Sequence, residues 1–587
     1  MIHRIYSDLP TFKNLELHGG LNVLLAERHN TATERQTRNR AGKSSLVQII
    51  HFLMGSSADR ASLFRQEALR EYKFGLVLDL PGGQVTVERK GSQYGHIVIR
   101  EGDTSAWPIQ PSMRRDVGRR LSRQDWCSVL GDVFFGMAVT DDRIPDSFRP
   151  TFRSVFSYFV RRERDGGFHV PQAHATIQQT WDQQVAVAFL LGLDWTIPQA
   201  WEMVRQREKA LTQLKKAAAQ GALGGIISSS AELRTQLVIA EQASERLNQA
   251  LGQFQVLAEY RELEQEASHI TRTMNELSNQ NTLDEQLLED LNGALASEQP
   301  PEMAAVSRLY EEAGVALPTM VSRRFEEVRA FHESIIANRR SYLSSEVSSA
   351  EERLGRRRRE MTGLDTRRAE IMRVLQSRGA LDQFQHLQQE ASRQQAETET
   401  IRQRFQAAEQ LEGASTELEI ERARLVQRLR RDLDEQGARV REAITTFESV
   451  SRALYEDEHA GSLTLEPTNN GLNLEIRIQG QGSRGIQNMQ VFCFDLMLMK
   501  LCSARRIGPR FLVHDSHLFD GVDERQVARA LQLGAETAEA CGWQYLVTLN
   551  SDDVPTSFPG QFNFAQHILP VTLTDQTENG GLFGFRF

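Results

Sequence analysis

The chain has 587 residues, of which 40% are hydrophobic and 25% are charged, and its formal net charge is −9. This composition is typical of a folded protein and excludes a disordered chain, and the length predicts about four domain-sized units. The acidic balance excludes a protein that binds nucleic acid over its whole surface, although a local basic stripe remains compatible with it.

Residues 1–200 are predicted to form a mixed α/β region. The first residues lack the apolar segment of a signal peptide, and the longest uncharged apolar run, residues 185–193, is far shorter than the roughly 20 residues of a membrane span. The four cysteines form no CxxC pair, so they indicate neither a disulfide framework nor a zinc site. We therefore expect a cytoplasmic protein with no membrane partner.

Alternating apolar residues and turn signals predict the elements of this region. Short strands are expected at 15–17 and 21–25, followed by a polar loop and then an apolar helix that ends at Gly55. Residues 74–80 and 85–89 flank the turn Pro81-Gly82-Gly83 and predict a β-hairpin, and another strand is expected at 96–100.

The middle of the chain, residues 201–455, carries apolar residues at alternating spacings of three and four. Leu263, Ala267, Ile270, Met274 and Leu277 give one such stripe, and similar stripes recur from Leu343 to Leu375. This spacing is typical of a coiled coil, and an ordinary long bundle helix is the alternative.

Prolines interrupt this pattern at Pro300-Pro301 and again at Pro318, because proline cannot continue a helix. We interpret 300–335 as the apex of an antiparallel hairpin, between an ascending arm at 201–299 and a descending arm at 336–455. Its best-defined parts would form a rod of about 65–85 Å. Gly379 and Gly413 are expected to break the descending arm, and the segment 380–425 has no predicted pairing partner.

Residues 456–587 return to an α/β pattern. Two strands around Asn469-Asn470-Gly471 predict a second hairpin, and an apolar helix is expected from about Asn488 to Cys502. A buried strand over 510–514, a helix from about Asp523 and a strand over 544–549 follow. Two α/β ends around a helical hairpin predict one split domain.

The segment Thr37-Arg38-Asn39-Arg40-Ala41-Gly42-Lys43-Ser44-Ser45 carries the sharpest chemical signal. It matches the phosphate-loop pattern GxxxxGK[ST], except that Thr37 replaces the first glycine. Gly42 lets backbone amides close around a phosphate, Lys43 supplies a positive charge and Ser44 supplies a hydroxyl for Mg²⁺. The N-terminus of the following helix favours anions.

A nucleoside triphosphate site also needs a carboxylate for the metal, and Asp515 follows the buried strand at 510–514. The upstream segment 479–485 contains Ser483 and Gly485 at the start of the preceding helix. These residues offer a hydroxyl and open amides to a phosphate. A solvated aspartate and a flexible loop with a helix cap are the simpler alternatives.

The order of these elements resembles the SMC-like branch of the ABC ATPases, in which a coiled-coil hairpin is inserted into one α/β ATPase head. Three segments narrow the resemblance: Ser157–Glu163, Arg324–Val328 and His514–Asp523. They resemble small bacterial SMC-like ATPases with a C-terminal domain of unknown function. Such proteins occur in three-component ABC systems and Lamassu-type defence operons.

The resemblance implies a role for each matching residue. Together with Mg²⁺, the ATP phosphates would be held by Asn39, Ala41, Gly42, Lys43, Ser44 and Ser45. Asp515 would be the Walker B metal carboxylate. Ser483 and Gly485 would be the signature motif, acting on the γ-phosphate bound to a second copy of the chain. Asp520 or Asp523 would belong to the D-loop, unless they are ordinary loop and cap acids.

The sequence also departs from this family. ABC ATPases usually have a glutamate directly after the Walker B aspartate, whereas this chain has Ser516 and then His517. His517 could act as the catalytic base, because imidazole titrates near neutrality. A structural His517 and slow hydrolysis, with ATP acting chiefly as a clamp, are the alternatives. Asn550 and Ser551 stand where a switch histidine is expected, and Gln172 and Gln178 are weak candidates for the Q-loop glutamine.

The resemblance implies an ATP-hydrolysing subunit that dimerises through its ATP-bound heads, clamps double-stranded DNA or DNA ends, and controls an effector, often a nuclease, beside a small accessory subunit in anti-phage or anti-plasmid defence. A DNA-repair ATPase and a coiled-coil scaffold with a degenerate nucleotide site are the alternatives.

Arginine runs offer the only direct sequence signal for DNA. They are Arg356–Arg359, Arg428–Arg431, Arg339-Arg340 and Arg367-Arg368. Such runs can neutralise phosphates without regard to sequence. A solvated coil face with acidic neighbours is the alternative.

Overall fold

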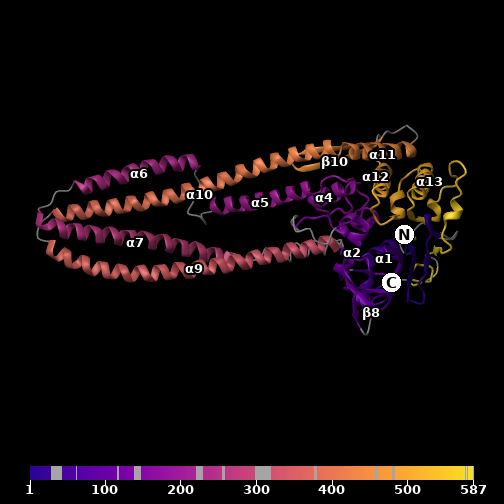
Figure 1. The fold of residues 1–587 in the computed structure, drawn as a ribbon, viewed down its shortest axis with the longest axis horizontal. Coiled ribbons are helices and arrows are strands. Elements are labelled where there is room, and N and C mark those ends of the chain that lie inside the picture. Colours follow the sequence, from indigo (N-terminus) through magenta and orange to yellow (C-terminus); the bar gives the residue numbers. More distant parts are fainter. Residues whose placement is uncertain are drawn as a thin grey trace. The chain divides into compact units, whose positions relative to one another are not determined.

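The computed structural model describes residues 1–587 except for 28–41, 61, 115–117, 138–146, 220–228, 254–257, 298–318, 376–379, 456–460, 479–482, 575–576, 578 and 586–587. The chain forms two compact units. Unit 1 comprises Met1–Met203, Ala304–Glu327 and Arg422–Phe587, and unit 2 comprises Val204–Met303 and Val328–Glu421. Each unit thus combines segments that are far apart in the sequence (Figure 1).

A parallel sheet in unit 1 joins the two ends of the chain. Its described strands are, in spatial order, β11 (Phe511–His514), β12 (Gln544–Asn550), β3 (Gly20–Glu27) and β13 (Leu573–Thr574). The N-terminal strand β3 pairs with β12 from Gly20 to Ala26, with Val23 opposite Val547. The two α/β ends therefore complete one sheet, which confirms the predicted split domain.

A second sheet in unit 1 is antiparallel. Its described strands are, in spatial order, β2 (Leu15–Glu16), β1 (Ile2–Ser7), β4 (Lys73–Leu80), β5 (Gly83–Lys90), β6 (His96–Glu101), β8 (Gly118–Ser122) and β7 (Ser112–Arg114). The predicted hairpin at 74–89 is β4–β5, in which Leu76 faces Val87. The sequence did not predict β1, β7 or β8.

Helices and a small hairpin complete unit 1. They are α1 (Lys43–Leu53), α2 (Arg123–Phe135), α3 (Phe152–Phe156), α4 (Thr180–Leu191), α11 (Gly437–Tyr455), α12 (Arg484–Ala504), α13 (Glu524–Cys541) and the hairpin of β9 (Gly461–Thr468) with β10 (Gly471–Ile478). Most residues of helix α12 are buried, and most of the buried ones are apolar.

Long helices make up unit 2. They are α5 (Thr196–Ala219), which begins in unit 1, α6 (Ser230–Gly252), α7 (Ala258–Ser297), α9 (Thr319–Leu375) and α10 (Ala380–Glu435), which ends in unit 1. Helix α9 has 57 residues and is therefore about 85 Å long.

Helices α7 and α9 form the expected antiparallel pair. Asp284 contacts Arg353, and Glu266, earlier in α7, contacts Arg367, later in α9. Ala267, Ile270 and Ile371 form a buried apolar cluster between them. The spacing of three and four thus identified the coiled-coil seam correctly.

Helix α10 corrects the prediction of a single hairpin. It runs antiparallel to α6, since Glu241 contacts Arg402 and Ser230 contacts Glu412. It runs parallel to α7, since Gln388 contacts Ser268 and, further along both helices, Ser392 contacts Asn275. The helix direction therefore reverses between α6 and α7 and between α9 and α10, in addition to the predicted reversal.

The predicted apex at 300–335 lies outside the described residues up to position 318. Helix α9 then begins at Thr319. Gly413 does not interrupt the descending arm as predicted, because helix α10 continues through it. One glycine costs a helix only about 1 kcal/mol, which packing along the seam offsets. The domain boundaries drawn at 200, 299, 335 and 455 stay predictions. Of the described helices, none is apolar over enough of its length to cross a bilayer.

Candidate active site

The carboxyl edge of the parallel sheet carries the candidate site. Strands β3, β12 and β11 run in the same direction, so their carboxyl ends meet at one edge. Helix α1 follows β3, Asn550 ends β12 and Asp515 follows β11. Open parallel sheets bind ligands in the crevice outside these ends, so the fold brings the sequence-predicted residues of both chain ends to one place.

Helix α1 begins directly after Gly42, which has a φ of 85°. A side chain at Gly42 would also meet the Cβ atom and backbone nitrogen of Leu582 at 3.2 Å, so the position favours glycine twice. Among the described residues no side chain caps α1, which leaves its N-terminus suited to an anion. Asn39 and Ala41 lie outside the described residues.

Lys43 is the first residue of α1 and is 8% exposed. Its Nζ atom donates to Oδ1 of Asn550, and Nδ2 of Asn550 donates to Asp553 at 2.5 Å. The position of the missing switch histidine is therefore occupied by an amide that contacts the predicted phosphate-binding lysine. Sequence analysis named Asn550 but not this contact, which depends on the pairing of β3 with β12.

Asp515 is 2% exposed, and its Oδ1 atom accepts hydrogen bonds from Thr548 at 2.9 Å and Ser516 at 3.3 Å. Within the described part of the chain, Oδ2 of Asp515 accepts no hydrogen bond, and this residue lines a hollow together with Ser44. Mg²⁺ in nucleotide sites binds one or two carboxylates together with the substrate phosphates. One carboxylate and one hydroxyl fit this ion.

The hollow at this edge has a volume of about 270 Å³. It is lined by Ser44, Val47, Gln48, Ser56, Ser57, Asp59, Ser62, Phe64, Arg162, Glu163, Arg164, Asp515 and His517. It brings together the predicted residues Ser44, Asp515 and His517, and two arginines add positive charge. Gln172 and Gln178 do not line it. Gln178 instead accepts a hydrogen bond from the His174 backbone and donates one to Asp182.

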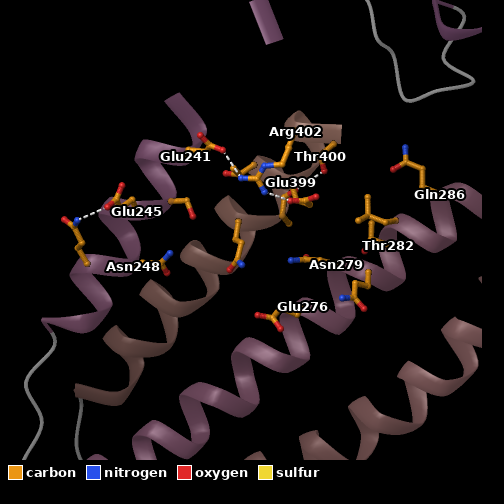
Figure 2. Close-up of a pocket in the computed structure, with 17 residues that line it drawn as sticks. Glu241, Glu245, Asn248, Glu276, Asn279, Thr282, Gln286, Glu399, Thr400 and Arg402 are labelled. Atoms are coloured by element: carbon orange, nitrogen blue, oxygen red, sulfur yellow. Dashed lines mark hydrogen bonds and ion pairs between the residues drawn. The ribbon is translucent and has the colours of Figure 1, made fainter. Parts of the chain in front are cut away.

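A larger hollow of about 730 Å³ lies in unit 2, between α6, α7 and α10 (Figure 2). Four glutamates line it, namely Glu241, Glu245, Glu276 and Glu399. Its one lining arginine, Arg402, is paired with Glu241 and Glu399. This excess of negative charge disfavours a polyphosphate, so we assign the nucleotide site to the smaller hollow.

His517 forms a hydrogen bond through Nδ1 to Asp520 at 3.0 Å, and its side chain is 31% exposed. This bond, with the charges of Asp515 and Glu163, raises the pKa of His517 above its usual value despite partial burial. A raised pKa favours the protonated ring, which cannot accept a further proton. The predicted role of His517 as a base stays a proposal that these electrostatics disfavour.

Ser483 and Gly485 lie at the start of α12. The Ser483 hydroxyl caps the helix by accepting from the backbone N–H of Ile486 at 3.2 Å, and Gly485 packs so closely on Gly521 that a Cβ atom would lie 2.3 Å from the Gly521 carbonyl oxygen. Neither residue lines the hollow of its own chain. Residues 479–482 lie outside the described part. Asp523 caps α13, as its simpler interpretation predicted.

A buried polar network fixes α1 to the segment 159–163, which lies within Ser157–Glu163, one of the three segments that narrow the family resemblance. Nε2 of His51 donates to the Val160 carbonyl at 2.7 Å, and Arg153 donates to Nδ1 of His51 and to the Met54 carbonyl. Burial lowers the pKa of His51 well below its usual value, so the ring is neutral and can accept from Arg153. Val160 also forms a parallel bridge to Val513 of β11, so the segment 159–163 passes along the edge of the parallel sheet at this residue.

A second buried network ties this segment to α12. Arg161 donates through two nitrogens to Asp495, both at 2.7 Å, and Asp495 also contacts His514 at 3.2 Å. All three side chains are 0% exposed. Arg161 further donates to the carbonyls of Gly167, Pro171 and Ala173. The carboxyl ends of two neighbouring strands are thereby held in place.

Several arginines of the runs that suggested DNA binding are paired with acidic residues of the same chain. Arg357 is buried and paired with Asp284, Arg358 contacts Glu285 and Arg367 contacts Glu266. In the second run, Arg428 contacts Asp194. These contacts match the alternative of a coil face with acidic neighbours.

Comparison with known families supports the resemblance. Residues 286–412, from the end of α7 into α10, match the sequence model of C-terminal domain 10 of the ABC-three component (ABC-3C) systems. Residues 450–587 match a family described as an uncharacterised protein conserved in bacteria (DUF2326). These two matches confirm the part of the resemblance that concerns ABC-three component systems and a C-terminal domain of unknown function.

Whole-chain relatives are distant. The uncharacterized protein YydD of Bacillus subtilis (strain 168) is 18% identical over 589 residues, covering 97% of this chain and 96% of YydD. The Smc head domain with a coiled coil and joint from Pyrococcus yayanosii is 13% identical, with a TM-score of 0.33 and coverage of 94% and 92% of the two chains. The Smc head domain with an extended coiled coil, bound to the C-terminal domain of ScpA, from Pyrococcus furiosus, is 11% identical. Its TM-score is 0.34, and the match covers 94% of this chain and 90% of that chain.

Proposed function

We propose that unit 1 is an ATP-hydrolysing head that binds MgATP at the carboxyl edge of its parallel sheet. The observation that carries this proposal is the meeting of Ser44 and Asp515 in one hollow, although they are separated by most of the chain. Asn39, Ala41, Gly42, Lys43 and Ser45 would hold the phosphates, and Ser44 and Asp515 would hold Mg²⁺. The ion would neutralise phosphate charge and orient the γ-phosphate.

A second copy of the chain would complete the site. Ser483 and Gly485 lie outside the hollow of their own chain, and the N-terminus of α12 offers amides to an anion. If they contact the γ-phosphate bound by another copy, ATP favours the joined pair, because only that pair makes both sets of contacts. Nucleotide hydrolysis would then release the pair.

The biological role that we propose is an SMC-like ATPase subunit of a defence system, which senses or clamps DNA and controls an effector, such as a nuclease, beside a small accessory subunit. Membership of a multicomponent system is supported by the match of residues 286–412. The DNA part rests on the resemblance alone, since the paired coil arginines give it no support. A DNA-repair ATPase is the alternative of the same class.

A scaffold with a degenerate nucleotide site is favoured by one observation. Ser516 stands where ABC ATPases usually have a glutamate, and its hydroxyl donates to Asp515. The scaffold would keep the coil and lose nucleotide turnover.

ATP binding and turnover by the full-length chain separate these functions. We expect Lys43→Ala to weaken ATP binding at least tenfold and Asp515→Asn to abolish Mg²⁺-dependent turnover, while the exposed control Lys209→Ala behaves like the wild type. A wild-type chain that neither binds nor hydrolyses ATP would leave the scaffold as the function. Turnover by His517→Ala at the wild-type rate would exclude His517 as the base.

A further inference from the structure

The carboxylate that ABC ATPases place after the Walker B aspartate is missing here. Its position is occupied by Ser516, which is 3% exposed, donates its hydroxyl to Asp515 and donates its backbone N–H to Thr548. Because this hydroxyl already donates to the metal-binding carboxylate, Ser516 is poorly placed to take a proton from water. Any hydrolysis therefore needs a proton acceptor from another element.

The segment 159–163, which lies beside β11, supplies a candidate proton acceptor. The backbone N–H of Val513 donates to the Phe159 carbonyl at 2.8 Å, and Val160 pairs in parallel with Val513. The segment and β11 thus end at the same edge of the sheet. Glu163 follows in a short helix (Glu163–Asp165) and lines the same hollow as Ser44, Asp515 and His517.

The carboxylates of Asp59 and Asp520 also lie near the hollow, and Asp520 shares with Glu163 a contact to Arg484 at 3.8 Å. The charge of Asp59 acts on Arg162, whereas the charge of Glu163 acts on His517 beside Asp515. Asp520 is hydrogen-bonded to His517. The ion-pair contact of Glu163 is Arg484, at 3.8 Å, and that arginine is 65% exposed. Such an exposed and long contact constrains a side chain only weakly.

We propose that Glu163 is the carboxylate that orients the attacking water. Its position shortly after the residue that bridges β11 would replace the glutamate that is missing after Asp515. In this step the water oxygen forms a bond to the γ-phosphorus while its proton passes to the Glu163 carboxylate. The bond between the γ-phosphorus and the β,γ-bridging oxygen breaks, ADP leaves with the electron pair, and Glu163 returns the proton to the inorganic phosphate. This inference rests on the proposed function and deepens it.

The buried networks explain why this geometry would be reproducible. The Arg161–Asp495 pair and the His51–Val160 hydrogen bond fix the backbone on both sides of Val160. A water-orienting group must be held within reach of its water, because small misplacements cost large factors in rate.

Glu163→Gln keeps the shape of the side chain and removes its ability to take a proton. We expect turnover of MgATP to fall at least 100-fold, the lower end of the range for general base catalysis. We also expect the affinity for ATP to change less than threefold, and unhydrolysed ATP to remain bound to a persistent dimer in gel filtration. Unfolding followed by tryptophan fluorescence verifies that the variant is folded, and Glu163→Asp supplies a second test, with a smaller loss of turnover.

Glu16→Gln, at an exposed glutamate on β2, is the matched control and should turn over ATP like the wild type. Wild-type turnover by Glu163→Gln would overturn the assignment. If Asp59→Asn lost turnover in the same experiment, Asp59 would be the proton acceptor instead. A wild-type chain that binds ATP without hydrolysing it overturns the role of Glu163 but not nucleotide binding. A wild-type chain that binds no ATP overturns the proposed function itself.

Discussion

Arg161 in unit 1 and Arg367 in unit 2 lie in opposite environments. In unit 1, Arg161 is 0% exposed, forms a two-point ion pair with Asp495 and donates to three backbone carbonyls. In unit 2, Arg367 is 52% exposed and contacts Glu266, which is 43% exposed. Breaking a buried pair leaves an uncompensated charge, whereas breaking an exposed pair returns both groups to water. We therefore expect mutations in unit 1 to have the larger effects.

The tryptophans make this comparison measurable. All six lie in the segments of unit 1, at positions 107, 126, 181, 195, 201 and 543. Tryptophan fluorescence therefore reports on unit 1, while far-ultraviolet circular dichroism is dominated by the long helices, most of which belong to unit 2. Urea unfolding followed by both signals yields separate free energies if the units unfold independently.

The largest expected effect follows from breaking the buried pair. Asp495→Ala leaves Arg161 and His514 without their shared carboxylate, so we expect the free energy of unfolding of unit 1 to fall by about 3–5 kcal/mol. The fluorescence midpoint should move to lower urea while the helical signal of unit 2 changes little. A loss under 1 kcal/mol would show that water reaches this pair, contrary to its complete burial.

Lowering the pH should also destabilise mainly unit 1. His174 is buried among Arg153, Arg161 and Arg162, and burial together with these charges lowers the pKa of His174 to about 3. Its Nε2 atom lies 3.9 Å from Asp182 without a hydrogen bond, so the ring is neutral and forms no ion pair. In the unfolded chain its pKa is about 6.5, so below that pH the unfolded state binds a proton that the folded state does not.

The sign follows from this difference. Stability falls as the pH falls from about 6.5 towards the folded pKa, by about 1.4 kcal/mol per pH unit for His174, or about 2 kcal/mol by pH 5. His51 and His514, whose pKa values are also lowered, act in the same direction, whereas the raised pKa of His517 opposes them. His174→Gln should flatten the dependence of the fluorescence midpoint on pH between 6.5 and 5. An unchanged slope would contradict a neutral His174.

The pair at the middle of the coil should have an intermediate effect. Asp284 accepts from Arg353 and Arg357, and its side chain is 11% exposed. Arg353 and Arg357 hold the pKa of Asp284 below its usual value, through hydrogen bonds and charge. We expect Asp284→Asn to lower the stability of unit 2 by about 1–2 kcal/mol, detected by circular dichroism with the fluorescence midpoint unchanged. A fluorescence shift of equal size would instead indicate that both units unfold together.

Local patterns predicted most elements of both units, because each of these helices and strands depends on residues that are close together in the sequence. The seam through Ala267 and Ile270 and the hairpin at 74–89 depend on spacings that sequence displays directly. The direction of α10 could not be predicted in this way. Its partners Glu241 and Ser230 are far away in the sequence, and each contact is only one exposed pair or hydrogen bond.

The candidate site shows the same division. Lys43 and Asp515 were identified by their type and by the elements beside them. The contact of Lys43 with Asn550 and the place of Glu163 were not, because both depend on which strands are neighbours in the sheet. The signal that was available for Glu163 was its place at the end of Ser157–Glu163, a segment that carries the family resemblance but by itself assigns no role to the glutamate.

The smallest expected effect is that of breaking the exposed pair of Arg367 and Glu266 in unit 2. Glu266→Gln removes one partner of Arg367, which keeps a second contact with Glu370 at 3.3 Å. Because the partners are exposed and salt screens them, we expect the stability of unit 2 to change by at most about 0.5 kcal/mol, and the change to vanish in 1 M salt. Circular dichroism at low and high salt measures both quantities. A salt-independent loss above 1 kcal/mol would mean that packing of the side chain, and not its charge, holds α7 against α9, and the contrast between the units would then lie in packing alone.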